Sequence, residues 1–217
     1  MIRAVIWDFD GTLVDSPPLV AAATNAALSE AGFAVVADLA AIRAGMALPT
    51  VPRMALHAGL PAEDPRAKSL ADAFYRHAAR LVPEYARPLP EVPETVRTLQ
   101  ARGIPQAIVS NNQGSLIRAT LAAWGLRTCF ASVLGDGDLP APKPDPRGCW
   151  MAAAACAAAP ADCAYIGDSL IDRDTALAAG MLPIAVAWGT TEPARLVGFA
   201  RVVQQAHEIL DLLDAMR

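Results

Sequence analysis

Short apolar runs alternate with helix-like segments along most of the chain. Runs of this kind are typical of strands that are buried on both faces of a parallel sheet. Strands that are separated by helices imply right-handed crossovers. The pattern therefore predicts the α/β fold class, with a Rossmann-like open parallel sheet as the core. The expected strands are 4–7, 106–109, 130–134, 163–166, 183–188 and, more weakly, 201–203.

Residues that typically begin, cap or end helices stand between these strands. Pro93 suits a first helical turn, because its missing N–H is not needed there, and Gly103 ends that helix. Ser115 is expected to cap the next helix, and Gly180 to close the helix that follows 163–166.

The segment from about residue 15 to residue 88 contains only helix-like patterns, and prolines bracket it. Prolines gather near its start (Pro17, Pro18) and near its end (Pro83, Pro88, Pro90, Pro93), and each group is expected to stiffen a hinge. The sequence therefore predicts two domains: an α/β catalytic core of residues 1–14 and 89–217, and an inserted α-helical domain of residues 15–88. The helices expected in the insert are 19–31, 39–45 with Asp38 as its cap, one that Thr50 caps and that reaches Gly59, and a long one that opens at Asp64 and ends at Pro83.

Composition and charge narrow the classes of partner. The chain has 217 residues and a net charge of −4, so no basic field attracts nucleic acid or an anionic membrane. The longest apolar run, 150–159, is mostly alanine and far shorter than the roughly 20 residues of a membrane span. Early aspartates leave no apolar region for a signal peptide, and the 4 cysteines form no CxxC pair. We expect a cytoplasmic protein with reduced thiols.

Reactive side chains directly follow three of the predicted strands. In an open parallel sheet, ligands bind at the carboxyl ends of the strands. Three such groups at equivalent positions predict one shared site. The groups are Asp8 and Asp10 after 4–7, Ser110 and Asn111 after 106–109, and Asp168 with Asp172 after 163–166.

The first pair of aspartates suits phosphoryl chemistry. Asp8 and Asp10 can face the same side of the strand end, and Gly11 lets the backbone turn closely and offer its N–H to an anion. With an ordinary pKa of about 3.9, Asp8 is an ionised nucleophile at neutral pH and needs no base. A phosphoryl group is also negative, and two like charges about 4 Å apart repel by roughly 4 kcal/mol at an effective dielectric of about 20.

Positive charge in the site would offset this repulsion between Asp8 and the phosphoryl group. Asp168 can complete an oxygen-rich Mg²⁺ site with Asp8. Lys143 can supply an ammonium group, and it is one of only two lysines, with Lys68, in a chain that otherwise uses arginine. Asp10 can protonate a leaving group.

Each of these residues also has a plain structural explanation. The Asp8–Asp10 pair can cap a turn, Ser110 and Asn111 can cap the following helix, and Lys143 can be a solvated surface residue. Asp172 stands in the first turn of a helix, where a carboxylate is a common cap. The sequence leaves capping and a place in the site both open for Asp172.

Four segments together resemble the motifs of the haloacid dehalogenase superfamily, in order and in spacing. They are WDFDGTLVDS at 7–16, IVSNN at 108–112, APKPDP at 141–146 and YIGDSLID at 165–172.

Several roles are implied by this resemblance. Asp8 would form an aspartyl-phosphate, and Asp10 would act first as the acid and then as the base that activates water. Mg²⁺ would be held by the carboxylates of Asp8 and Asp168 and the backbone carbonyl of Asp10, with Asp172 supporting it through water. The phosphoryl group would be bound by residues of the first three motifs, namely Gly11, Thr12, Ser110, Asn111 and Lys143.

Within the superfamily, the chain is similar to phosphoglycolate phosphatases, whose helical (C1-type) cap stands where the insert stands here. Glu91 replaces a glycine that is usual in them, and Asn112 replaces a frequent lysine. The resemblance implies a Mg²⁺-dependent phosphatase that hydrolyses a small phosphorylated metabolite, a phosphoglycolate-like phosphomonoester, as a monomer or a homodimer.

Two alternatives stay open. A phosphosugar mutase would use the same aspartates, but β-phosphoglucomutase-like relatives have a histidine early in the cap, and none stands near Val20. A non-enzymatic member that binds a metabolite or a partner would be expected to lack the nucleophile, a metal ligand or the lysine, and all three are present.

Overall fold

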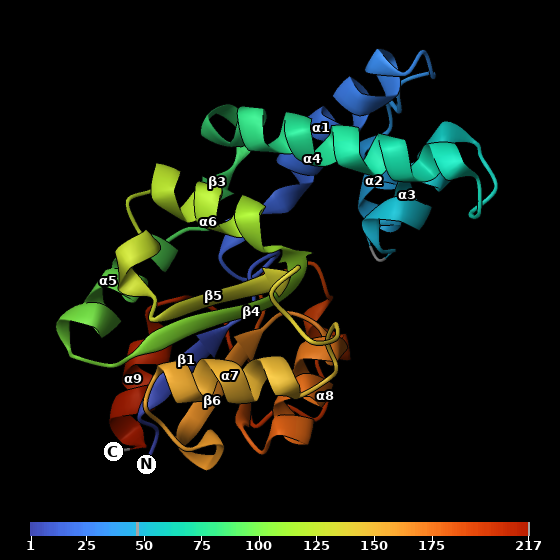
Figure 1. Cartoon of the computed structure of the whole chain (residues 1–217). Coiled ribbons are helices and arrows are strands. Elements are labelled where there is room, and N and C mark those ends of the chain that lie inside the picture. The colour runs from blue at the N-terminus through green and yellow to red at the C-terminus, as the bar shows by residue number, and fades with distance from the viewer. Residues whose placement is uncertain (47, 217) are drawn as a thin grey trace. The chain divides into compact units, whose positions relative to one another are not determined.

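The computed structural model describes residues 1–46 and 48–216. These residues divide into two compact units (Figure 1). The larger unit consists of Met1–Asp15 and Pro88–Arg217, and the smaller unit is Ser16–Arg87.

The larger unit is built on one six-stranded sheet. In chain order its strands are β1 (Ala4–Trp7), β4 (Gln106–Gln113), β5 (Ser132–Asp136), β6 (Cys163–Gly167), β7 (Leu182–Val186) and β8 (Arg201–Val203). Their order across the sheet is β5-β4-β1-β6-β7-β8, and every neighbouring pair is parallel. The predicted α/β fold class with an open parallel sheet is confirmed.

Four strands differ from the prediction at one or both ends, and β6 differs only by continuing one residue further, to Gly167. β4 continues to Gln113 because a register shift between Val109 and Gln113 returns the chain to pairing with β5. β5 starts two residues later than 130, because a 3₁₀ turn, Arg127–Cys129, brings the chain to it. β7 stops at Val186, before the predicted end at residue 188.

Alternate residues of the central strands face opposite sides of the sheet, as the period of two requires. Ile6, Val109 and Tyr165 share a buried cluster with residues of α7 (Arg147–Ala155) and α8 (Leu170–Ala179). On the other face, Gln106 accepts a hydrogen bond from the Trp7 indole and donates one to the carbonyl of Val96 in α5 (Val92–Ala101). The sheet is therefore covered on both faces, which explains its nearly continuous apolar strands.

The remaining helices of the larger unit are α6 (Gly114–Ala123) and α9 (Glu208–Ala215). Pro93 lies in the first turn of α5, and Gly180 ends α8 in the left-handed region, both as predicted. Ser115 lies inside α6 and does not cap it, because the helix already begins at Gly114. Glu91 has a φ of 61°, which explains why a glycine would suit that position.

The smaller unit is helical, as predicted. Its helices are α1 (Ser16–Glu30), α2 (Leu39–Gly45), α3 (Thr50–Ala58) and α4 (Pro65–Tyr85). Asp38 and Asp64 cap α2 and α4 through side-chain hydrogen bonds to backbone N–H groups. Two short strands, β2 (Val14–Asp15) and β3 (Arg87–Pro88), pair with each other apart from the main sheet.

The prolines of this region and Thr50 behave differently from the prediction. Pro17 and Pro18 form the first turn of α1 and not a hinge before it, because a first turn does not need their N–H groups. Pro83 does not end α4, which continues for two residues to Tyr85. Thr50 is the first residue of α3, and Pro49 occupies the cap position.

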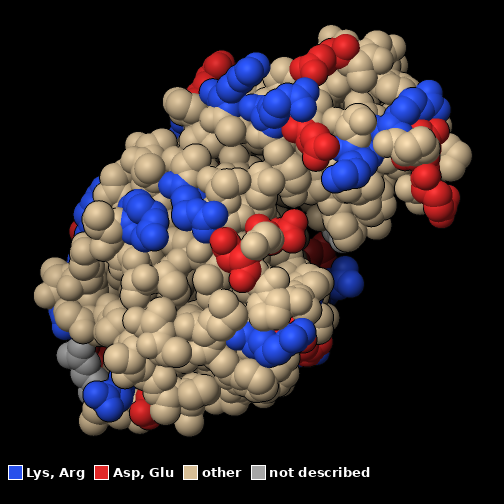
Figure 2. Space-filling view, in the orientation of Figure 1, with Lys and Arg blue, Asp and Glu red and all other residues tan. Residues whose placement is uncertain are grey.

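Within the described part of the chain, no helix is long and apolar enough to cross a membrane. Positive and negative side chains alternate in small groups over the face drawn in Figure 2.

Candidate active site

The candidate site lies where the strand order of the sheet reverses. β1 stands between β4 and β6, so the chain builds one side of the sheet after β1 and then crosses to the other side. Ligand sites of open α/β sheets form at such a switch point, beyond the carboxyl ends of the strands. Asp8 directly follows β1 and Asp168 directly follows β6, as predicted. Ser110 and Asn111 lie within the irregular end of β4 and do not follow it.

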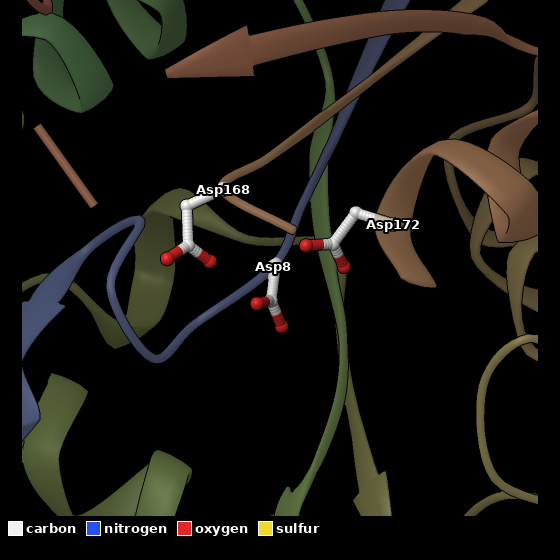
Figure 3. Close-up of side chains that lie close together, drawn as sticks. All are labelled: Asp8, Asp168 and Asp172. Atoms are coloured by element: carbon white, nitrogen blue, oxygen red, sulfur yellow. The ribbon is translucent and has the colours of Figure 1, made fainter. Parts of the chain in front are cut away.

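Three carboxylates converge at this point (Figure 3). One oxygen from each of Asp8, Asp168 and Asp172 lies within 4.8 Å of the others. Their residues are 6%, 3% and 0% exposed. Carboxylates are rarely buried unless they are paired, so this cluster has a cost that the fold must offset.

Lys143 enters the cluster from the loop between β5 and α7. Its Nζ donates hydrogen bonds to Oδ1 of Asp8 at 2.7 Å and to Oδ1 of Asp172 at 2.6 Å. Lys143 is 8% exposed, so it is not the solvated surface lysine of the alternative interpretation. The ammonium is fixed between two carboxylates from distant parts of the chain.

The crowding of like charges changes the protonation of Asp8. Burial and the carboxylate of Asp172 raise the pKa of Asp8, the Lys143 ammonium opposes them, and the resulting pKa is about 8. Asp8 with only protein groups around it is therefore not the fully ionised nucleophile that its ordinary pKa predicts. Burial also raises the pKa of Asp168.

The lysine stays charged. Burial acts to lower the pKa of Lys143, but the carboxylates of Asp172 and Asp8 outweigh it and raise that pKa well above its ordinary value. Three carboxylates thus face one permanent ammonium.

These residues fit a divalent cation. When the three carboxylates are ionised, two negative charges remain after pairing with Lys143, and one divalent cation would balance them. Carboxylate oxygens are the ligands that Mg²⁺ prefers, and those of Asp8 and Asp168 lie in the same small space.

Asp172 has two roles: it accepts a hydrogen bond from the site lysine, and it caps a helix. Its Oδ2 accepts hydrogen bonds from the backbone N–H of Ser169 at 3.0 Å and from the Ser169 hydroxyl at 2.6 Å, while Oδ1 accepts from Lys143. Ser169 and Asp172 form a capping box at the start of α8. Asp172 therefore both caps α8 and contacts the site through Lys143, the two interpretations that the sequence left open. Both of its oxygens are engaged by protein groups.

Tyr165 is a member of the network that the sequence analysis did not identify. Its hydroxyl donates to the carbonyl of Val109 at 2.8 Å and accepts from Lys143 Nζ at 3.2 Å. Tyr165 is fully buried in β6. The available signal was a polar tip in an otherwise apolar strand, three residues before Asp168.

The second motif holds the lysine loop. Asn111 Oδ1 accepts from the backbone N–H of Lys143 at 2.7 Å, and its Nδ2 donates to the Lys143 carbonyl at 3.3 Å. Ser110 is 2% exposed, and its Oγ accepts from the backbone N–H of Asn112 at 3.3 Å. Asn112 in turn donates from Nδ2 to Oδ2 of Asp10 at 2.9 Å.

Gly11 and Thr12 lie in the turn after β1. Gly11 has a φ of 73°, and a Cβ on it would collide with the Asp168 carboxylate, so only glycine fits. The Gly11 N–H, which was expected to face an anion, donates to the carbonyl of Val14 at 3.0 Å. Thr12 is fully buried.

Comparisons with known proteins identify the family of the chain. The family model of haloacid dehalogenase-like hydrolases matches residues 5–186. A phosphoglycolate phosphatase of Pseudomonas syringae pv. syringae is 31% identical over 194 residues, covering 86% of this chain and 70% of that protein. A probable phosphatase, IndB, of Dickeya dadantii is 33% identical over 219 residues, covering 96% and 95% of the two chains.

A solved structure shows the same fold. The crystal structure of a predicted phosphoglycolate phosphatase from Haemophilus somnus superimposes with a TM-score of 0.85, covers 98% of each chain, and is 23% identical in sequence. The chain belongs to the haloacid dehalogenase-like hydrolase family. Its inserted helical region stands where members with a helical cap carry that cap.

Proposed function

We propose that this protein is a Mg²⁺-dependent phosphatase that hydrolyses a small phosphorylated metabolite through an aspartyl-phosphate on Asp8. The observation that carries the proposal is the buried carboxylate of Asp8, 2.7 Å from Lys143 Nζ and clustered with Asp168 and Asp172. Negative charge gathered around a fixed ammonium suits a site that must receive a phosphoryl group and a cation together.

In the first step, one oxygen of Asp8 forms a bond to phosphorus as the ester P–O bond breaks. Lys143 stays hydrogen-bonded to the other oxygen and offsets negative charge as the phosphoryl group approaches. Asp10 gives its proton to the oxygen of the departing alcohol. Asn112 holds the Asp10 carboxylate from Nδ2, which fixes the direction of that transfer.

In the second step, Asp10 takes a proton from water, whose oxygen forms a bond to phosphorus as the bond to Asp8 breaks. The products are inorganic phosphate and free Asp8. In this proposal, the phosphoryl group is surrounded by Ser110, Asn111, Gly11 and Thr12. Asn111 has a second role, because it holds the backbone of Lys143 through hydrogen bonds.

The carboxylates of Asp8 and Asp168 and the carbonyl of Asp10 would hold Mg²⁺, and bound Mg²⁺ would neutralise charge on the phosphoryl oxygens. Asp172 would support Mg²⁺ through water and would not bind it directly, because both of its oxygens are engaged by Lys143 and Ser169. In this proposal, the helical unit Ser16–Arg87 acts as the cap that admits the substrate and excludes bulk water.

The names of relatives guide the choice of substrate. Phosphoglycolate phosphatases at about 30% identity support a small phosphomonoester that also carries a carboxylate. The test is a panel of phosphorylated metabolites, each assayed for free phosphate with and without Mg²⁺. We expect Mg²⁺-dependent phosphate release that is fastest with phosphoglycolate.

Two other outcomes would contradict the proposal. Interconversion of sugar phosphates without release of phosphate would identify a mutase. A lack of turnover across the panel would favour a binding protein.

A further inference from the structure

We propose that Thr190 is a positioning residue for Asp168 and fixes the orientation of the carboxylate that Asp168 presents to Mg²⁺. This inference rests on the proposed function. Thr190 lies after β7, outside the four motifs that carry the family resemblance.

Two short hydrogen bonds support the assignment. The backbone N–H of Thr190 donates to Oδ2 of Asp168 at 2.6 Å, and the Thr190 hydroxyl donates to the same oxygen at 2.7 Å. Hydrogen bonds to an ionised carboxylate are about twice as strong as neutral ones. Oδ2 is thus occupied by two donors, which leaves Oδ1 as the oxygen available to a cation.

The segment around Thr190 is itself held against the site. A Cβ on Gly189 would collide with the Asp168 side chain, so the backbone approaches the carboxylate as closely as it can. The Trp188 indole donates from Nε1 to the carbonyl of Thr12 at 3.2 Å. The three consecutive residues therefore join the turn after β1 to the turn after β6.

The position of Asp168 between these turns limits its freedom. Gly11 lies against the carboxylate from the β1 side, and Gly189 from the β7 side. Within this slot, rotation about the last bond of the side chain sets the plane of the carboxylate. The two hydrogen bonds from Thr190 oppose that rotation, because it would move Oδ2 away from both donors.

The test compares Mg²⁺ binding in three variants. Thr190→Val keeps the shape of the side chain and the backbone N–H but removes the hydroxyl. Thr190→Ser keeps the hydroxyl. Thr191→Val makes the same change one residue further on, and none of the hydrogen bonds of the described residues joins Thr191 to Asp168. Thr190 is exposed, so its replacement leaves the apolar core intact.

Titration calorimetry with Mg²⁺ alone gives the direct readout. We expect Thr190→Val to weaken Mg²⁺ binding about tenfold, the usual size of the effect when a partner behind a metal ligand is removed. Thr190→Ser and Thr191→Val should bind as the wild type does. In the phosphatase assay, higher Mg²⁺ should restore the rate of Thr190→Val with an unchanged KM for substrate.

The melting temperature of the metal-free variants separates positioning from simple stabilisation. A structural role alone would lower that temperature and leave the Mg²⁺ dissociation constant unchanged, which would overturn the inference. Wild-type Mg²⁺ affinity in Thr190→Val would also overturn it. If the wild-type protein itself bound no Mg²⁺, the proposed function would fail instead.

Discussion

The two units of the molecule differ in how many charged side chains they bury and in whether these form a cluster. In the larger unit, the buried charged residues of the described chain are Asp8, Lys143, Asp168 and Asp172, and all four belong to one network. In the helical unit, the ion pairs of Glu30 with Arg76 and of Asp64 with Arg66 have half-exposed or more exposed arginines.

The cost of burial explains what this difference means. Exposed ion pairs cost little to form and contribute little to stability. Buried carboxylates lose their hydration, and selection for stability alone would replace them with apolar residues. The concentration of buried charge at the switch point of the sheet is therefore the reason why we propose the active site there. Arg53 is the buried charge of the helical unit, and its guanidinium lies over the Phe74 ring, 4.8 Å from the centroid.

Removing the ammonium should have the largest effect. Lys143→Met leaves two buried carboxylates without their partner, which typically costs about 3–5 kcal/mol of unfolding free energy. Phosphatase activity should fall by about a thousandfold, the rate equivalent of roughly 4 kcal/mol. Urea unfolding and the phosphate-release assay measure the two effects. Lys68→Met, at the only other lysine and on the exposed surface of α4, is the matched control and should change neither quantity.

The metal-free protein should lose stability as the pH rises. The pKa of Asp8 is about 8 in the folded protein and near 3.8 in the unfolded chain. The folded state therefore holds a proton that the unfolded state has released, so unfolding becomes easier between pH 4 and pH 8 by up to about 1.4 kcal/mol per pH unit.

Urea unfolding in EDTA across this range measures that slope, and saturating Mg²⁺ should reduce it because the cation stabilises ionised Asp8. Asp8→Asn should also reduce it. A metal-free protein whose stability stayed constant from pH 5 to pH 8 would show that the carboxylates are not electrostatically crowded.

A smaller effect is expected for Tyr165→Phe. The variant loses only the hydroxyl, which is hydrogen-bonded to Val109 and Lys143, and leaves the Val109 carbonyl without that donor. Unfolding free energy should fall by about 1–2 kcal/mol and kcat by several-fold. Val202→Ala, on the partly exposed strand β8, controls for a general loss of stability. If Tyr165→Phe kept full kcat, the phenol would have no part in holding Lys143.

The smallest effect is expected at the exposed pair of the helical unit. Arg76→Ala removes the partner of Glu30 that lies at 2.8 Å, but the arginine is 53% exposed and water replaces the contact. The urea midpoint and kcat should match those of the wild type within experimental error. A loss comparable to that of Lys143→Met would remove the contrast between the two units.

The sequence predicted the parts of the structure that depend on local pattern. β1 was predicted to the residue, because a run buried on both faces ends abruptly at the charged Asp8. The roles predicted for three prolines were wrong, because the effect of a proline depends on its position in a helix. Pro17 and Pro18 lie in the first turn of α1 and not in a hinge, and Pro83 lies within the last turn of α4 and does not end it.

The partners of the site residues depend on strand order and register, which the spacing of motifs does not contain. Tyr165 meets Lys143 only because β6 packs beside β1 and because the residue faces α7 and α8. Asn111 meets the backbone of Lys143 across the end of the sheet. Thr190 follows a strand whose end carries no charged side chain, so nothing in its sequence indicates a contact with Asp168.

Acid quenching during turnover tests the central claim most directly. The enzyme is mixed with phosphoglycolate labelled on phosphorus, stopped in acid, digested, and mapped for the label. The account predicts label on the peptide that contains Asp8, with no label and no phosphate release in Asp8→Asn. Undiminished phosphate release by Asp8→Asn would contradict it, and so would a labelled peptide from another part of the chain.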